Sequence, residues 1–208
     1  TGSKKSRIAK VNSDYTPLSS LGEIVNISWI TPQLCVLILS NMSEKRRFID
    51  RLTLAIDSLH LNRVYKYDKL LRQRNKILIQ PNFDKTWLDT IESKISELSI
   101  SIIARRLDLL EELENLYNFE LKNNHLTEHF PSASIIINGK IEKLLNEKPA
   151  VEVEDYIKSE LKKSRYDCEL SVSGPNNSII EIFNRLDNKN IDTSSTGEQK
   201  LILISIVL

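Results

Sequence analysis

The sequence lacks the features of a secreted or a membrane protein. Only two of its 208 residues are cysteine, Cys35 and Cys168, and no C-x-x-C pair occurs. A reduced intracellular protein is the simplest interpretation of such sparse cysteine. No stretch approaches the ~18 consecutive apolar residues of a membrane span, and no secretory leader opens the sequence. We therefore expect a cytoplasmic protein with no membrane partner.

Glycine and net charge are also scarce. Five glycines in the whole chain leave no room for a glycine-rich linker, and the net charge of +1 does not indicate a nucleic-acid partner. A local basic patch remains compatible with a balanced total. Hydrophobic residues make up 40% and charged residues 27% of the chain, which is ordinary for a globular protein with a sizeable core.

The hydrophobic pattern indicates strands, then a long helical region, then strands again. Strict alternation predicts a strand over residues 24–30, before Thr31 and Pro32. Apolar residues at helical spacing predict helices near residues 44–60, 64–78, 87–121 and 152–165. Further strands are expected over residues 7–12, 134–139, 169–172 and 179–183. This order favours a mixed α/β head that is interrupted by a helical insertion.

The end of the chain carries the most informative motif. Residues 194–200 read SSTGEQK and are followed at once by an apolar helix. Small hydroxyls, a glycine and a helix N-terminus are typical of a phosphate-facing backbone. The same residues fit a capping box, in which Ser195 and Glu198 satisfy each other's free amides. The motif alone leaves both interpretations open.

A basic series forms a second candidate site. Arg46 and Arg47 lie in the first predicted helix, and Arg72 and Arg74 lie in the second. Their side chains are suited to phosphate, which makes a DNA-binding surface one interpretation. The alternative is a solvated helix face whose cations pair with neighbouring carboxylates.

Other chemistry is weakly represented. Residues 125–129 match the H-x-x-E-H pattern of zinc proteases, but Phe130 and Pro131 would break the helix that such a site requires, and we expect no metal site. No G-x-x-x-x-G-K-[ST] loop and no nucleophile–histidine arrangement occurs in the chain. The chain alone is therefore expected not to hydrolyse ATP.

Several motifs in fixed order resemble those of a known family. The sequence reads WITP at residues 29–32, KRRFIDRL at 45–52, RQRNKIL at 72–78 and STGEQK at 195–200. This succession resembles the TP, RRxFLDR, QRN and STGEQK runs of the bacterial RecF DNA replication and repair proteins. The resemblance covers nearly the whole chain, and we expect the chain to be an internal piece of such a protein.

The resemblance implies a fold and a division into domains. The expected fold class is α/β, mixed α+β: part of an ATP-binding-cassette head with an inserted helical, coiled-coil-like second lobe. Residues 1–42 would form a β-rich part of the head, residues 43–130 the helical lobe, and residues 131–208 the return to the head. The phosphate-binding Walker A loop would precede this segment, and the Walker B strand would follow it.

The resemblance also implies cofactors, partners and site residues. A complete family member is a weak DNA-dependent ATPase that uses ATP and Mg²⁺, dimerises with ATP between its heads, binds gapped or junction DNA, and assists recombinase loading with RecO and RecR. By position, the residues that would contact the partner subunit's nucleotide are Ser195, Gly197, Glu198, Gln199 and Lys200.

The chain departs from the family at one turn. The family has GPHR followed by an acidic residue, whereas this chain has GPNN at residues 174–177. Any role of the missing histidine and arginine is therefore in question. A second interpretation of the whole chain is a non-catalytic, SMC-like helical scaffold or adaptor, in which the tail is only a helix cap.

Overall fold

The computed structural model describes residues 9–16, 31–80, 84–122, 131–166 and 172–207. The strands expected at residues 24–30 and 169–172 and the H-x-x-E-H pattern at 125–129 lie wholly or mostly outside these ranges. Most of the described chain is helical, with a two-stranded and a three-stranded antiparallel sheet.

A short hairpin occupies the beginning of the described chain. Strand β1 (Ala9–Val11) pairs with β2 (Asp14–Thr16). The two loop residues, Asn12 and Ser13, have φ values of 50° and 76°. Two consecutive positive φ angles match the twist of a two-residue hairpin loop, and asparagine tolerates this region better than most residues. The strand predicted at residues 7–12 is thus confirmed over its central part.

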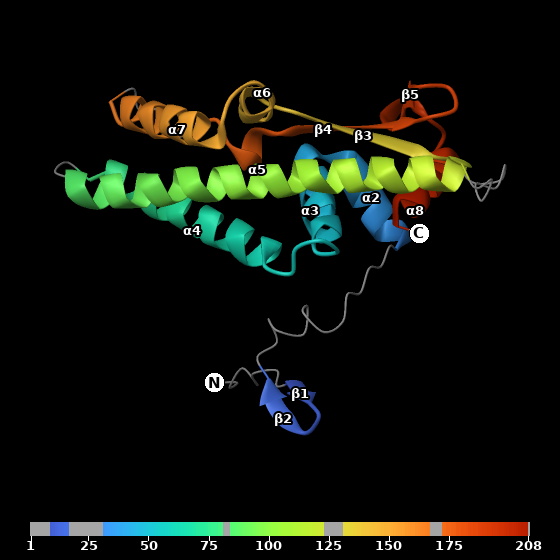
Figure 1. The fold of residues 1–208 in the computed structure, drawn as a ribbon, viewed down its shortest axis with the longest axis horizontal. Helices are drawn as coiled ribbons and strands as arrows, with labels where there is room; N and C mark the ends of the chain where they lie inside the picture. The colour runs from blue at the N-terminus through green and yellow to red at the C-terminus, as the bar shows by residue number, and fades with distance from the viewer. Residues whose placement is uncertain (1–8, 17–30, 81–83, 123–130, 167–171, 208) are drawn as a thin grey trace.

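The helices confirm most of the sequence pattern. The long periodic stretch forms one helix, α5 (Lys85–Lys122), which runs the length of the molecule in Figure 1. The other predicted helices appear as α3, α4, α7 and α8. Their bounds are α3 (Met42–Thr53), α4 (His60–Leu78), α7 (Ala150–Ser164) and α8 (Thr196–Val207).

Two differences from the pattern concern helix boundaries. The helix expected over residues 44–60 ends at Thr53, and α4 starts a new helix at His60. In the intervening turn the Asp57 carboxylate accepts the Leu59 backbone amide at 3.1 Å. Such a side-chain bond offers the backbone an alternative to the helical ladder, so the helix stops here.

Two helices were not predicted. Helix α2 (Pro32–Ser40) begins at a proline that the pattern treats as a strand stop, although proline is also favoured at the first position of a helix. Its sequence is apolar almost throughout, so no helical period stands out. Helix α6 (Lys140–Glu147) has only eight residues, too few for a secure periodic signal.

The three-stranded sheet has the order β3-β4-β5, with β3 (Ala133–Asn138), β4 (Ile179–Asn184) and β5 (Lys189–Asn190). Its register places Ile135 opposite Ile182 and Ile137 opposite Ile180. Alternate residues of a strand share one face, so these isoleucines form a single apolar surface. That surface packs on the helices at one end of α5.

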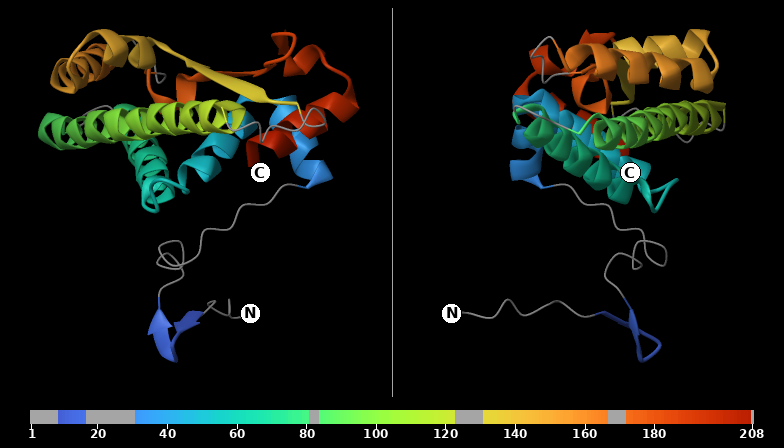
Figure 2. Two further views of the ribbon diagram at one scale, coloured as in Figure 1. Left: turned by 45° about the vertical axis from the view of Figure 1, so that its right-hand side comes forward. Right: turned by 90° about the vertical axis from the view of Figure 1, so that its left-hand side faces the viewer.

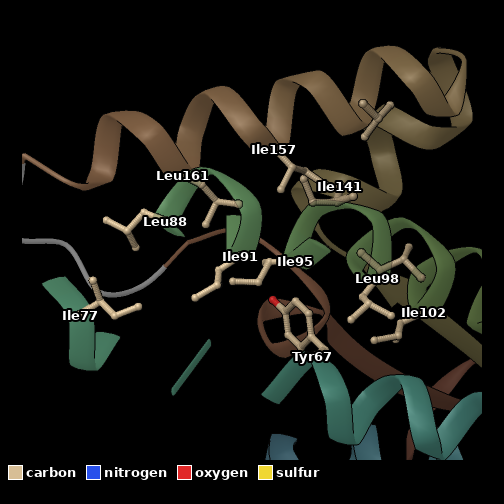
Figure 3. Packing of buried hydrophobic residues seen from close by; sticks show 12 residues of the cluster. Tyr67, Ile77, Leu88, Ile91, Ile95, Leu98, Ile102, Ile141, Ile157 and Leu161 are labelled. Atoms are coloured by element: carbon tan, nitrogen blue, oxygen red, sulfur yellow. The ribbon is translucent and has the colours of Figure 1, made fainter. Parts of the chain in front are cut away.

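The core consists of two clusters along α5. The first joins α4 and α5 with α6 and α7, and Figure 3 shows Leu88, Ile95 and Ile102 of α5 packed among residues of the other helices. The second joins α2, α3, the sheet and α8 around Leu109 of α5. Figure 2 shows the same arrangement in two further views, and in the right-hand view the left end of Figure 1 faces the viewer. Helix α5 is therefore common to both clusters.

The two clusters do not follow the domain borders expected from the sequence. Helix α3, assigned to the helical lobe, contributes Phe48 and Ile49 to the second cluster. Helices α6 and α7, assigned to the head, contribute Ile141 and Ile157 to the first. The division at residues 42/43 and 130/131 remains a prediction, and packing crosses both borders.

Candidate functional site

The SSTGEQK motif forms an exposed loop and the first turn of α8. Ser195 is the residue before this helix, and its backbone amide donates to the Glu198 carboxylate at 2.8 Å. In return the Glu198 amide donates to Ser195 Oγ at 3.4 Å. This is the reciprocal capping box expected from the spacing. The hydrogen bond from the Ser195 amide lowers the pKa of Glu198 and so further favours its ionised form.

Two amides of this turn remain open. Within the described ranges no acceptor faces the backbone N–H groups of Thr196 and Gly197. A Cβ at Gly197 would meet no heavy atom within 4 Å, so packing inside the chain does not require a glycine there. The helix start therefore presents free donors and open space to solvent, which is suitable for an anion.

Hydrogen bonds and an ion pair within the chain fix the loop before α8. The Gln199 side-chain amide donates to the Ile191 carbonyl at 2.9 Å. Lys45 of α3, almost wholly buried, reaches the Asp192 carboxylate at 2.8 Å. Burial raises the pKa of the Cys35 thiol, and the positive charge of the half-buried Lys200 partly offsets this rise. These contacts fix η3 (Ile191–Thr193) and thereby the position of Ser195.

The four arginines of the predicted basic patch have different environments. Arg47 is exposed and pairs with Glu44 one turn earlier. Arg46 is half-buried, and its guanidinium donates to the Ser178 carbonyl at 2.9 Å. Burial lowers the pKa of Arg46, and the nearby charge of Arg106 adds to this effect. Arg72 is exposed on α4. The structure does not bring these four side chains together on one surface.

Arg74 differs most from the expected exposed patch. Its side chain is 0% exposed and donates to Glu92 at 2.8 Å, to the Leu161 carbonyl at 2.8 Å and to Ser164 Oγ at 2.8 Å. Arg74 therefore joins α4 to α5 and α7 inside the first cluster. An arginine enclosed in this way has no surface to offer DNA, and it holds three helices together instead.

A buried ionic centre was missed by sequence reasoning. Arg106 of α5 donates to both oxygens of Asp50, at 2.8 and 3.0 Å, and His60 Nε2 lies 2.7 Å from the same carboxylate. All three residues are at most 3% exposed. Burial opposes ionisation of Asp50, but hydrogen bonds from His60 and Arg106 outweigh it and lower the pKa of the carboxyl group. Arg106 lies 56 positions from Asp50, and nothing local in the sequence links residues that far apart.

The same centre holds the turn where the chain departs from the GPHR pattern. Arg106 Nη1 donates to the Pro175 carbonyl at 2.8 Å, in the 3₁₀ turn η2 (Pro175–Asn177). A Cβ at Gly174 would lie 2.5 Å from the Tyr67 hydroxyl, so this close approach requires glycine. Asn176 is exposed and donates to Asp68 at 3.0 Å. The two asparagines thus lie in an exposed turn, and the buried side chain of Arg106 holds the start of that turn.

The described residues offer neither a cluster of metal ligands nor a helix that could cross a membrane. In these ranges no group of three or more histidine, cysteine, aspartate or glutamate side chains is placed to hold a metal ion. None of the described helices combines the length and apolarity that crossing a membrane demands.

Comparison with known proteins places this geometry in a family. No protein-family model matches the chain. Two curated relatives are DNA replication and repair proteins RecF: that of Agrobacterium fabrum is 35% identical over 201 residues, and that of Rickettsia bellii is 34% identical over 206. These alignments cover 93% and 97% of this chain but 52% and 55% of the relatives. The chain thus spans about half the length of the curated relatives that it matches.

Solved structures share the fold. Two structures of the recombination mediator protein RecF in the RecFOR pathway, one with ATPrS and one with ATP, match with TM-scores of 0.70 and 0.66 at 22% and 20% identity. Each match covers 96% of this chain and 54% of the other. The described chain therefore has the fold of part of a recombination mediator protein. It belongs to the RecF family of DNA replication and repair proteins, as its motifs predicted.

Proposed function

We propose that this chain is the part of a RecF-type DNA replication and repair protein that completes an ATP site on the opposite subunit. The observation that carries the proposal is the start of α8, where a hydroxyl and two open amides face solvent at the end of a helix. An N-terminal helix dipole and free N–H groups favour a phosphate at that point. Two RecF structures of the same fold are described with ATP and with ATPrS, which supports a nucleotide as the partner of this loop.

In this proposal each residue of the motif has a distinct task. A serine hydroxyl donates one hydrogen bond and accepts others, so Ser195 Oγ keeps its cap to Glu198 while donating to a phosphate oxygen. The amides of Thr196 and Gly197 add two donors. Glu198 is ionised and cannot donate to phosphate, so it orients the Ser195 backbone. Gln199 fixes the loop through Ile191, and Lys200 adds positive charge one turn into the helix.

The remaining chemistry would come from the rest of the protein. The lysine that grips the phosphates and the acid that binds Mg²⁺ belong to Walker motifs, which this chain does not contain. We further propose DNA, an ATP-dependent second copy, and the recombination mediators RecO and RecR as partners. The name RecFOR pathway, attached to both matched structures, supports the last of these.

The test uses a chimera in which this chain replaces the matching half of Rickettsia bellii RecF, to which it aligns over 97% of its length. Ser195→Arg should abolish ATP-dependent dimerisation in sedimentation experiments, because a bulky side chain blocks the approach of the other subunit's phosphate. Nucleotide titration of the monomer should remain unchanged. Val151→Arg, at a site that is 71% exposed on α7, is the matched control and should still dimerise.

A helical scaffold without nucleotide contact is the second candidate, and the completed capping box favours it. The box explains the spacing of Ser195 and Glu198 in this loop by local structure alone. In that case Ser195→Arg costs only the helix cap, and a folded chimera still dimerises with ATP. Sedimentation therefore separates the two candidates.

A further inference from the structure

One face of α4 carries a straight row of exposed side chains. At about 100° per residue, Tyr65, Lys69, Arg72 and Lys76 fall within an arc of ~60° on the helix surface. All four are exposed, Tyr65 by 65%. The opposite side of the helix holds the buried residues Tyr67, Arg74 and Ile77. The row is thus turned away from the first cluster.

The three cations of this row have no ionic partner within the part of the chain that the structure describes. Other surface cations are paired along their own helices, as in Lys94–Glu97, Arg105–Asp108 and Lys158–Glu154. The carboxylate nearest in sequence, Asp68, accepts from Asn176 in the turn η2. The positive charge of the row is therefore not neutralised by the fold.

We propose that this face of α4 binds the phosphate backbone of DNA. From Tyr65 to Lys76 the row is ~16 Å long at the rise of an α-helix. A duplex carries one negative charge per ~1.7 Å of axis, so the row can face several phosphates of one strand. The exposed Tyr65 ring at one end offers a stacking surface to an unpaired base. This inference rests on the proposed function, which names DNA as a partner, and it adds the surface of the chain to which DNA binds.

Residue composition favours nucleic acid over an acidic protein. Three of the four members are cations, and two are lysines, which are depleted in protein–protein interfaces. Phosphate contacts need only charge and hydrogen-bond donors, which lysine and arginine supply. Of the four arginines expected from the sequence to bind DNA, only Arg72 belongs to this row.

The test measures binding of the 208-residue chain to duplex and single-stranded DNA over a range of salt concentrations. The triple variant Lys69→Gln, Arg72→Gln, Lys76→Gln should reduce the slope of log affinity against log salt by ~2.7 for duplex DNA, about 0.9 per lost contact. Circular dichroism should show an unchanged fold, because these side chains make no internal pair. Tyr65→Ala should weaken single-strand binding and leave duplex binding unchanged.

A matched control removes three charges elsewhere: Lys143→Gln, Lys148→Gln and Lys163→Gln, exposed residues on or beside α6 and α7. It should keep the parental slope. An equal loss in both triple variants, or no change in the α4 variant, would overturn the proposal. Polyglutamate of matched charge that competes as well as DNA would overturn it in favour of an acidic protein. None of these outcomes depends on nucleotide or on Ser195, so this test is independent of the dimerisation test.

Discussion

Arg72 and Arg74 stand two residues apart on the same helix and have opposite surroundings. Arg72 lies on the exposed face of α4, whereas Arg74 is enclosed between three helices with Glu92 as its partner. Two residues rotate a helical side chain by about 200°, which is enough to move it from solvent to core. Arg106 of α5 is likewise enclosed, and it holds Asp50 in the buried ionic centre. Some arginines of this chain are buried and join helices, and others carry charge on the surface. The position of the residue around the helix axis determines which environment it has.

Removing a buried arginine should cause the largest effect. Arg106→Met leaves the Asp50 carboxylate buried with only His60 beside it, and we expect a loss of about 3–5 kcal/mol in the free energy of unfolding. Arg74→Met should cost less, because Arg165 still donates to Glu92. Arg72→Met should stay within about 0.5 kcal/mol, as is usual at exposed positions. Urea denaturation of the three variants measures the order.

A double variant identifies the cause of this loss. Replacing both partners, as in Asp50→Leu with Arg106→Met, removes the unpaired charge and should recover part of the stability lost in Arg106→Met alone. If the double variant is as unstable as the sum of the two single variants, lost packing rather than a stranded charge explains the effect.

The buried centre should also respond to acid. The pKa of Asp50 is lowered in the folded chain, so its ionised form contributes stability above its unfolded pKa, and that contribution is lost as pH falls through the lower folded pKa. The unfolding free energy should therefore decline below about pH 4, near the pKa of a free aspartate. Asp50→Asn starts less stable and should lack this part of the decline. Parallel curves for the two proteins between about pH 2 and 5 would contradict the assignment.

A smaller effect than at the buried centre is expected at the exposed cap of α8. Ser195→Ala removes the side-chain acceptor of the Glu198 amide and should lower stability by about 0.5–1 kcal/mol. Ser93→Ala, at an exposed position inside α5, is the control and should be neutral or slightly stabilising, because alanine favours helix. Thermal unfolding of both variants measures the difference. Equal behaviour of the two would show that the cap contributes nothing.

The elements that were predicted correctly from the sequence are those set by patterns over a few neighbouring residues. The periodic residues of α5, the alternation in β3 and the three-residue spacing of the capping box all act over a few positions, and each is confirmed. The carboxylate partners of Arg74 and Arg106 lie 18 and 56 residues away, at separations over which a single sequence carries no visible signal. Helices α2 and α6 were not predicted for a different reason, because α2 is apolar on most of its surface and α6 is short.

The single helix shared by both clusters acts mechanically as a lever. Helix α5 has 38 residues and is therefore about 57 Å long. A rotation of about 5° at the end that shares a cluster with α8 would displace the far end by about 5 Å, if the helix stays straight. Helix α8 shares the second cluster with one end of this lever, and the buried side of α4, opposite its exposed row, packs on the other half. A movement of α5 at the end near α8 would therefore displace the half that packs on α4. No series of side-chain rearrangements between the two ends would be needed.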